Sequence, residues 1–164
     1  PNNKNIILAA NQAKELSNEN IEVIPTKTIP QGIAAILAYD ESADNEENIE
    51  NINSAIKNVK TGQVTFAVRD TNIGNKTIKK GNIIGISERD GIVTVTTSPE
   101  KTAVELVQNM ADKDTELIYI YYGEDVEEKE AEKLHKKLEK MYGNIDVVLQ
   151  YGGQPLYYYI VSVE

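Results

Sequence analysis

Apolar residues recur at the spacing of amphipathic helices in several stretches of the chain. Asn3 is a suitable capping residue for a first helix that ends near Ser17. Residues 31–39 are apolar on nearly all sides, so we expect a helix there that is buried between layers. Residues 44–59 begin with acidic side chains, end with basic ones and carry an aliphatic stripe, which predicts a third helix.

Short runs rich in β-branched residues predict strands between and after these helices. Residues 21–24 read Ile-Glu-Val-Ile, and residues 63–69 alternate between apolar and polar side chains. Two further strands are expected at 83–87 and 92–96, and Asp90-Gly91 marks a tight two-residue connection between them. This part of the chain is therefore predicted to be an antiparallel meander.

The last part of the chain has the element order of a β-α-β unit. Ser98-Pro99 starts a helix, and strands at 115–122 and 146–151 flank a strongly charged helix at 125–142. Parallel strands joined by a right-handed crossover are the usual solution for such a unit. A final strand is expected at 156–163.

These elements predict an α/β protein with two small lobes. The first lobe, residues 1–97, contains the first helices and the antiparallel meander, and the second lobe, residues 98–164, is a β-α-β unit with a mixed sheet. No strand precedes the helix that Asn3 caps, and the first residue is Pro1. We therefore expect an excised fragment in which the upstream half of the first lobe is missing.

Three polar loops are expected at the C-terminal ends of strands, where open α/β sheets usually receive ligands and partners. Each has a purely structural alternative: asparagines cap helices, threonines form turns, and paired glycines permit positive φ. Both interpretations stay open for each loop. The candidate binding residues are Asn2, Asn3 and Lys4, then Thr26, Lys27 and Thr28, then Gly152, Gly153 and Gln154.

Charge and composition narrow the classes of partner. The chain has 26 acidic and 17 basic residues, a net charge of -9, so its field repels nucleic acid and anionic membranes. It has no cysteine, which excludes disulfides and fits a reducing cytoplasm. Its apolar runs are far shorter than the roughly 20 residues of a membrane helix. We expect a cytoplasmic protein without a nucleic-acid partner or membrane insertion.

The sequence offers little that is typical of catalysis. His135 is the only histidine and lies among charged neighbours in a predicted helix, so we expect it on the surface. The acids between residues 124 and 132 suit a solvated helix start. Residues 81–85 lack the lysine of a phosphate-binding loop. We therefore expect no catalytic residue, no metal site and no cofactor in this chain.

Tyrosines gather in the second lobe. Exposed tyrosines give rigid contact area for a partner, whereas buried ones only pack a sheet, and the sequence fits both interpretations. The tyrosines concerned are Tyr119, Tyr121, Tyr122, Tyr151, Tyr157, Tyr158 and Tyr159.

Several segments of the sequence, taken together, are specific enough to indicate a protein family. They are Pro1-Asn2-Asn3-Lys4-Asn5-Ile6, the run from Val23 to Ala35, Lys60-Thr61-Gly62-Gln63-Val64-Thr65 with Ala67-Val68-Arg69-Asp70-Thr71, and Gly152-Gly153-Gln154-Pro155-Leu156-Tyr157. Together they resemble the C-terminal region of the large subunit of fatty acid kinases, in the dihydroxyacetone-kinase-like family. These segments add Gln31, Gln63 and Arg69 to the candidate binding residues.

The resemblance implies that catalysis and partner binding belong to different parts of the parent chain. ATP and magnesium are expected in a kinase domain elsewhere in the parent chain, and this region is expected to recruit a DegV-like fatty-acid-binding protein. The acyl carboxylate that this partner holds would then be phosphorylated. The resemblance also implies that the lobes are similar to DegV-like and dihydroxyacetone-kinase-like α/β folds, the first lobe being truncated.

Two other functions are also considered. The polar edge with Asn3, Thr26 and Gln154 fits a small-molecule module for a carboxylate or a phosphate. A structural or dimer-forming element is the third interpretation. His135 does not match the substrate-binding histidine of dihydroxyacetone kinases, so we do not expect direct binding of dihydroxyacetone.

Overall fold

Side-chain caps start the first three helices of the computed structural model, which describes residues 2–74 and 76–164. Asn3, Thr28 and Asp44 each accept a backbone N–H from three residues further on. The helices predicted from the spacing of apolar residues are confirmed. They are α1 (Lys4–Leu16), α2 (Ile29–Leu37), α3 (Asn45–Asn58), α4 (Pro99–Met110) and α5 (Glu128–Met141).

The strands predicted after residue 59 are present, but β1 covers residues 60–66 rather than 63–69, the last strand starts at residue 159 rather than 156, and the two short strands at 71–73 and 76–78 were not predicted. Residues 88–90 separate β4 from β5, and Gly91 has a φ of 72°, so the connection has three residues rather than the predicted two. The strands are β1 (Lys60–Phe66), β2 (Thr71–Ile73), β3 (Lys76–Ile78), β4 (Ile83–Ser87), β5 (Gly91–Thr96), β6 (Leu117–Tyr122), β7 (Asp146–Tyr151) and β8 (Tyr159–Val163).

The described residues form two compact units, one ending at Val59 and the other beginning at Lys60. This division differs from the predicted boundary between residues 97 and 98. The reason is that β8, at the end of the chain, pairs with β1 on one side and β6 on the other. Strands from both sides of the predicted boundary therefore belong to one sheet.

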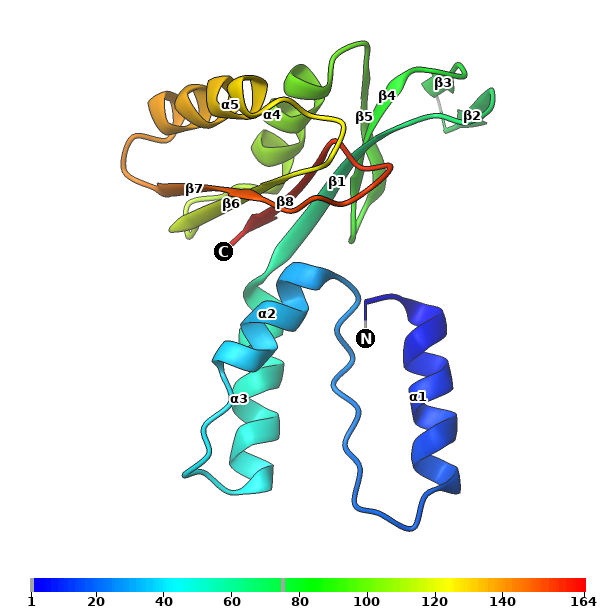
Figure 1. The fold of residues 1–164 in the computed structure, drawn as a ribbon, viewed down its shortest axis with the longest axis vertical. Coiled ribbons are helices and arrows are strands. Elements are labelled where there is room, and N and C mark those ends of the chain that lie inside the picture. Colours follow the sequence, from blue (N-terminus) through cyan, green and yellow to red (C-terminus); the bar gives the residue numbers. More distant parts are fainter. Residues whose placement is uncertain (1, 75) are drawn as a thin grey trace. The chain divides into compact units, whose positions relative to one another are not determined.

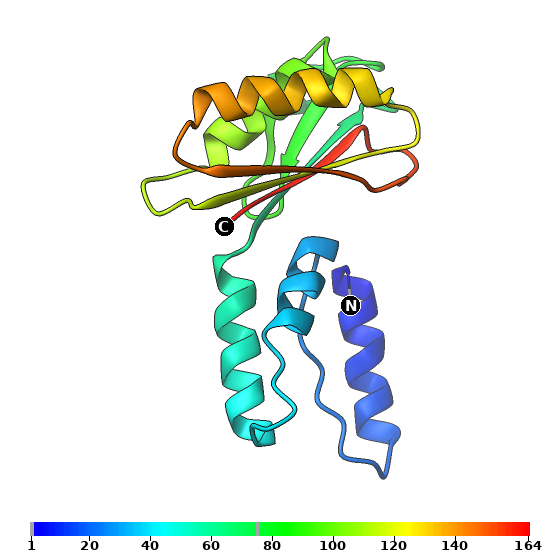
Figure 2. The same ribbon diagram turned by 60° about the vertical axis from the view of Figure 1, so that its left-hand side comes forward.

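The second unit is an α/β layer structure built on a mixed sheet with the strand order β5-β4-β1-β8-β6-β7. Strands β6 and β7 are parallel, as predicted for the β-α-β unit, and the other neighbours in this sheet are antiparallel. Helices α4 and α5 lie on the same face of the sheet (Figures 1 and 2). Strands β2 and β3 form a separate hairpin.

The core of the second unit lies between these helices and the sheet. Alternate residues of β6 and β8, such as Ile120 and Val161, belong with Leu134 and Leu138 of α5 to one buried cluster. Helix α4 packs closely, because a Cβ added at Gly62 of β1 would lie 2.7 Å from the Leu106 side chain. A side chain at that position would push the helix away from the sheet.

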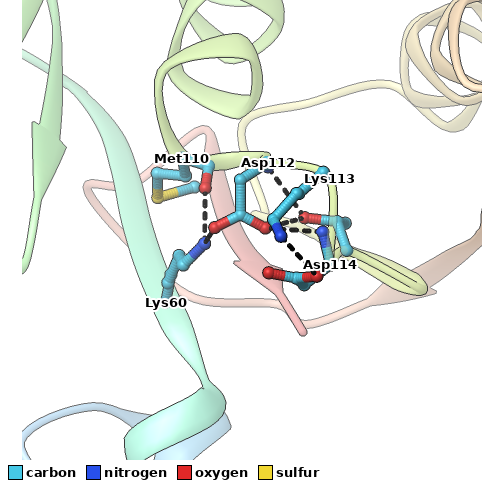
Figure 3. A network of polar contacts seen from close by, with 6 residues as sticks. Lys60, Met110, Asp112, Lys113 and Asp114 are labelled. Carbon is cyan, nitrogen blue, oxygen red and sulfur yellow. Dashed lines mark hydrogen bonds and ion pairs between the residues drawn. The ribbon is translucent and has the colours of Figure 1, made fainter.

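Lys60, at the start of β1, links the sheet to the end of α4 (Figure 3). Its Nζ donates to the Met110 carbonyl oxygen at 3.0 Å and also to the Asp112 carboxylate. That carboxylate also accepts the Asp114 backbone N–H at 3.1 Å. The lysine thus lies where the helix macrodipole favours a cation, and its hydrogen bond lowers the pKa of Asp112 below the usual value.

The first unit has a much smaller core. Ala35 of α2 and Ile52 and Ile56 of α3 are its buried apolar cluster, with Ile24 and Ala38 packed beside them. All residues of α1 are at least partly exposed. The packing of α2 against α3 therefore supplies most of the burial in this unit.

Two predictions for the first unit are wrong. Residues 21–24 are extended chain outside both sheets rather than a strand. Helix α2 is not buried between layers, since Ile36 and Leu37 are 77% and 80% exposed. The apolar pattern is present in both segments, but residues 21–24 pair with no described strand, and within the first unit α3 covers only the side of α2 that carries Ala35. Among these residues, no helix is long and apolar enough to cross a membrane.

Candidate functional site

Two surfaces of the chain are candidates for binding, one in each unit. The first is a groove of about 740 Å³ in the first unit. Aliphatic residues of α2, with Ile6 of α1 and Ile52 of α3, form most of its wall, and its polar members include Asn2, Thr26 and Thr28. We call it the apolar groove. It is lined by Asn2, Ile6, Ile24, Thr26, Thr28, Ile29, Gly32, Ile33, Ala35, Ile36, Tyr39 and Ile52.

The loop before α2 is held in place by its own polar side chains. Thr28 Oγ1 accepts the Gln31 backbone N–H at 3.3 Å, and Gln31 Oε1 accepts the Lys27 backbone N–H at 2.8 Å. This is a form of the capping box, in which a threonine at the helix start and a glutamine three residues later satisfy free backbone donors. Thr26, Thr28 and Gln31 are buried, whereas Lys27 is exposed.

The loop at the start of the chain also has a structural role. Asn3 Oδ1 accepts the Ile6 backbone N–H at 3.0 Å and so caps α1. Lys4 is the exposed first residue of that helix, and Asn2 contributes to the apolar groove. The structure therefore brings Asn2 together with Thr26 and Thr28, and it leaves Asn3 as a cap.

The second surface lies where the parallel strands β6 and β7 end in the second unit. Tyr122 and Tyr151 end these strands, and their ring centroids are 5.2 Å apart. The loop that follows β7 presents Leu156, which is 62% exposed and has a φ of 69°. We call Tyr122, Tyr151 and Leu156 the tyrosine loop surface.

The conformation of this loop is fixed by specific hydrogen bonds. Gln154 Nε2 donates to the Tyr121 carbonyl oxygen at 2.9 Å, and Thr65 Oγ1 of β1 donates to the Leu156 carbonyl oxygen at 2.7 Å. Gly153 has a φ of 62°, which favours glycine. A positive φ at Leu156 is unusual for a branched side chain and persists only where the surroundings impose it. The loop is thus built to hold Leu156 outward.

The Tyr122 hydroxyl on this surface stays neutral over the physiological range. Burial raises the pKa of Tyr122, and the negative charges of Glu128 and Glu132, together with Tyr151, act in the same direction. A neutral tyrosine offers an apolar ring together with a hydroxyl that can both donate and accept. This combination suits protein contacts better than acid–base chemistry.

The family model for the C-terminal part of FakA-like fatty acid kinase subunits matches residues 1–164. The chain belongs to this family. The resemblance drawn from the sequence segments is therefore confirmed.

Curated relatives of this family are longer than the chain. Protein YloV of Bacillus subtilis (strain 168) is 47% identical over 165 residues, which cover 100% of this chain and 30% of that protein. A protein of Staphylococcus haemolyticus (strain JCSC1435) is 43% identical over 164 residues, with the same coverage of 100% and 30%. The chain thus spans 30% of the length of these FakA-like relatives.

A solved structure shares the fold. It is a crystal structure of a DegV-family protein from Ruminococcus gnavus with vaccenic acid, and the similarity has a TM-score of 0.58 at 14% sequence identity. The similarity covers 96% of this chain and 65% of that one. The predicted α/β fold with a DegV-like relationship is therefore confirmed for this member of the FakA-like family.

The remaining predicted site residues lie in different segments of the structure. Gln63 lies in β1 opposite Ile86 and Ile160, and Arg69 lies in the exposed chain after β1. The run from Gly152 through Gly153 to Gln154 follows β7, as predicted. The expectation that three loops share one sheet edge is wrong, because residues 21–24 form no strand for Thr26 to follow.

One residue expected on the solvated surface has a structural contact. His135 Nε2 lies 2.8 Å from the Val147 carbonyl oxygen of β7, and its Nδ1 lies 3.5 Å from Glu139. The side chain is 24% exposed. His135 therefore fastens α5 to the edge strand of the sheet, and the prediction of a purely solvated residue is wrong.

Tyr122 and Tyr151 are among the tyrosines that the sequence offers as contact area for a partner, whereas Leu156, Ile33 and Ile36 are not among the predicted site residues. The strand pattern extends the last strand to Leu156, and the apolar pattern places Ile33 and Ile36 in a buried helix. The available signal for Leu156 is its place after Gly-Gly-Gln-Pro, a run typical of a loop. For α2, the signal is that apolar residues lie on nearly all sides of the helix, whereas packing against one neighbouring helix buries only one side.

Proposed function

We propose that this chain is the C-terminal docking module of a fatty acid kinase. It holds a DegV-like fatty-acid-binding protein so that the carboxylate of the bound fatty acid reaches a kinase domain elsewhere in the parent chain. The carboxylate is there phosphorylated to an acyl phosphate. Family membership supports this assignment, because the matched family is the C-terminal part of FakA-like fatty acid kinase proteins.

The observation that carries the proposal is the tyrosine loop surface. Tyr151 and Leu156 are 58% and 62% exposed, and hydrogen bonds from Gln154 and Thr65 hold their loop. Rigid aromatic and aliphatic anchors lose little conformational entropy on binding and are typical centres of protein interfaces. Their position at the C-terminal ends of β6 and β7 is also the edge where α/β sheets receive partners.

The remaining parts of the reaction belong to the parent protein in this proposal. The relatives that match the whole chain are longer, since the chain covers 30% of each. The rest of the parent chain supplies the kinase domain, which binds ATP and magnesium in the cytoplasm. The chain described here binds the DegV-like protein and so holds the acyl carboxylate at a fixed place relative to the kinase domain.

Calorimetric titration of the complete parent protein with the loaded DegV-like protein tests the proposal. We expect Tyr151→Ala and Leu156→Gly each to weaken binding by about 30-fold, which corresponds to about 2 kcal/mol at an interface anchor. The matched control is Met141→Ala, which removes a 42% exposed apolar side chain from the far end of α5. It should leave the dissociation constant unchanged within about twofold.

Two results would contradict the proposal. One is the absence of binding by the unmodified parent protein. The other is equal binding by all variants, which would move the docking surface away from Tyr151 and Leu156. Circular dichroism of each variant shows whether the fold is retained, and Gly is chosen at position 156 because its φ of 69° suits glycine.

A second candidate function rests on the apolar groove. Thr26, Thr28, Asn2 and the Tyr39 hydroxyl are the polar groups of an otherwise apolar wall, as an amphiphile with one carboxylate or phosphate would require. Thermal shift with fatty acids and phosphorylated metabolites distinguishes this function, since a ligand of the native state raises the melting temperature. A flat response would leave docking as the function.

A further inference from the structure

The first unit exposes more aliphatic surface than a helical unit in water normally leaves bare. On α2, Ile29, Ile36 and Leu37 are 54%, 77% and 80% exposed, and on α1, Leu8 and Leu16 are 61% and 88% exposed. Large apolar side chains exposed in this number on two helices point to a contact with another part of a protein. Of these side chains, Ile29 and Ile36 line the apolar groove, to which α1 contributes Ile6.

The segment between α1 and α2 has a related feature. Residues 21–24 have the β-branched composition of a strand, and they are extended, yet they lie outside both sheets. Figure 1 shows this stretch running as an open trace from the end of α1 to α2. Extended chain of this composition readily pairs with another strand.

The order of elements indicates which kind of strand is missing. Helix α1 has 13 residues and ends at Leu16, a few residues before residue 21. Parallel strands need a crossover of a dozen or more residues, usually a helix, with loops of about 2–6 residues. Helix α1 and residues 21–24 therefore have the form of the second and third parts of a β-α-β unit.

We infer that the segment of the parent chain immediately upstream of residue 1 supplies the first part of this unit. It forms a strand parallel to residues 21–24, and the residues before it cover the exposed faces of α1 and α2. The relatives that match the whole chain have length for such a segment, because the chain covers only 30% of each. About a third of the DegV-family chain likewise has no counterpart here, since the similarity covers 65% of it.

The geometry favours this occupant over a second copy of the chain. A parallel strand that leads directly into α1 must be continuous with the helix, whereas a second copy would contribute the same helix face and the same extended segment. A second copy would also bring another net charge of -9. The inference is independent of the proposed docking function, which rests on the other unit.

Thiol labelling of the complete parent protein tests the inference, in a background without other reactive cysteines. This chain contributes none. We expect Ile36→Cys and Leu37→Cys to react at least about tenfold more slowly than the control Asn51→Cys. Asn51 is an exposed residue of α3 outside the apolar groove. If nothing covers α2, all three cysteines should react at similar rates, which would overturn the inference.

Amide hydrogen exchange on the unmodified parent protein provides a second measurement that needs no substitution. We expect the amides of residues 21–24 to exchange at least about 100-fold more slowly than an unpaired extended segment. Both experiments are done first on the monomer without the DegV-like protein, and then at a concentration that favours dimers and with that protein added. Unprotected amides would overturn the inference, and so would protection that appears only on dimerisation or only with the partner.

Discussion

Single residues in the polar loops act mainly on the backbone around them. Gln31 and Gln154 use their side-chain amides to hold the loop before α2 and the loop after β7. The first contact is accessible from the sequence, since Thr28 and Gln31 have capping-box spacing. The second is not, because the Tyr121 carbonyl oxygen comes from a strand 33 residues away. Local spacing contains no signal for such a contact.

A close backbone approach at Gly123 gives a prediction at this scale. A Cβ added there would lie 2.2 Å from the Tyr157 carbonyl oxygen and 2.6 Å from that of Gln154. We expect Gly123→Ala to lower the free energy of unfolding by about 1–3 kcal/mol, because the loop after β7 must move. Urea denaturation measures the change.

The matched control for this prediction is Gly143→Ala. A Cβ there has open space, with nothing within 4 Å. Its effect on the free energy of unfolding should stay within about 0.5 kcal/mol. Equal stability of the two variants would show that the loop after β7 does not pack against Gly123.

Among the elements, the helices are easier to predict than the environment of each helix. The caps at Asn3, Thr28, Asp44 and Ser98 are local signals, and each accepts a backbone N–H from three residues further on. The apolar composition of α2 predicts burial, but burial depends on what covers the helix. The same reasoning explains residues 21–24, since a strand requires a partner as well as a β-branched composition.

The junction of β1 with α4 gives a prediction about pH. Hydrogen bonds from Lys60 and from the Asp114 backbone lower the pKa of Asp112 below its ordinary value of 3.8. A carboxyl with a depressed pKa in the folded state adds stability that is present above the ordinary value and lost as the pH falls through the depressed one. The variant Asp112→Asn should lack this contribution.

Urea unfolding midpoints of the natural chain and of Asp112→Asn, measured from pH 7 down to below 3.8, check this expectation. The difference between the two proteins should be largest near neutral pH and should shrink at acidic pH. At neutral pH, the difference in unfolding midpoint should also be small in high salt, because salt screens the partly solvated pair of Lys60 and Asp112. A difference that is independent of pH would contradict an ionic role for Asp112.

For the whole molecule, the α/β class and the β-α-β unit follow from element order, whereas the division into units does not. The predicted boundary after residue 97 treats the meander and the β-α-β unit as separate. Strand β8 pairs with both β1 and β6, so the sheet joins residues that are about a hundred positions apart. Pairing over such separations depends on tertiary contacts that local patterns do not contain.

The two units also differ in the size of their buried cores. The second unit buries an extensive core between its sheet and two helices, whereas the first has only a small cluster around Ile52. This difference fits a chain whose second unit presents a finished docking surface and whose first unit is completed by upstream sequence. The docking proposal and the inference about the upstream segment both concern binding surfaces. Neither assigns a catalytic residue to this chain.

Hydrogen exchange of the complete parent protein, with and without the loaded DegV-like protein, tests the docking role most directly. We predict that the partner slows exchange at residues 122–124 and 151–157, which carry the tyrosine loop surface, and leaves α4 unchanged. Unchanged exchange in the loop after β7 under saturating partner, or protection confined to other segments, would contradict the account.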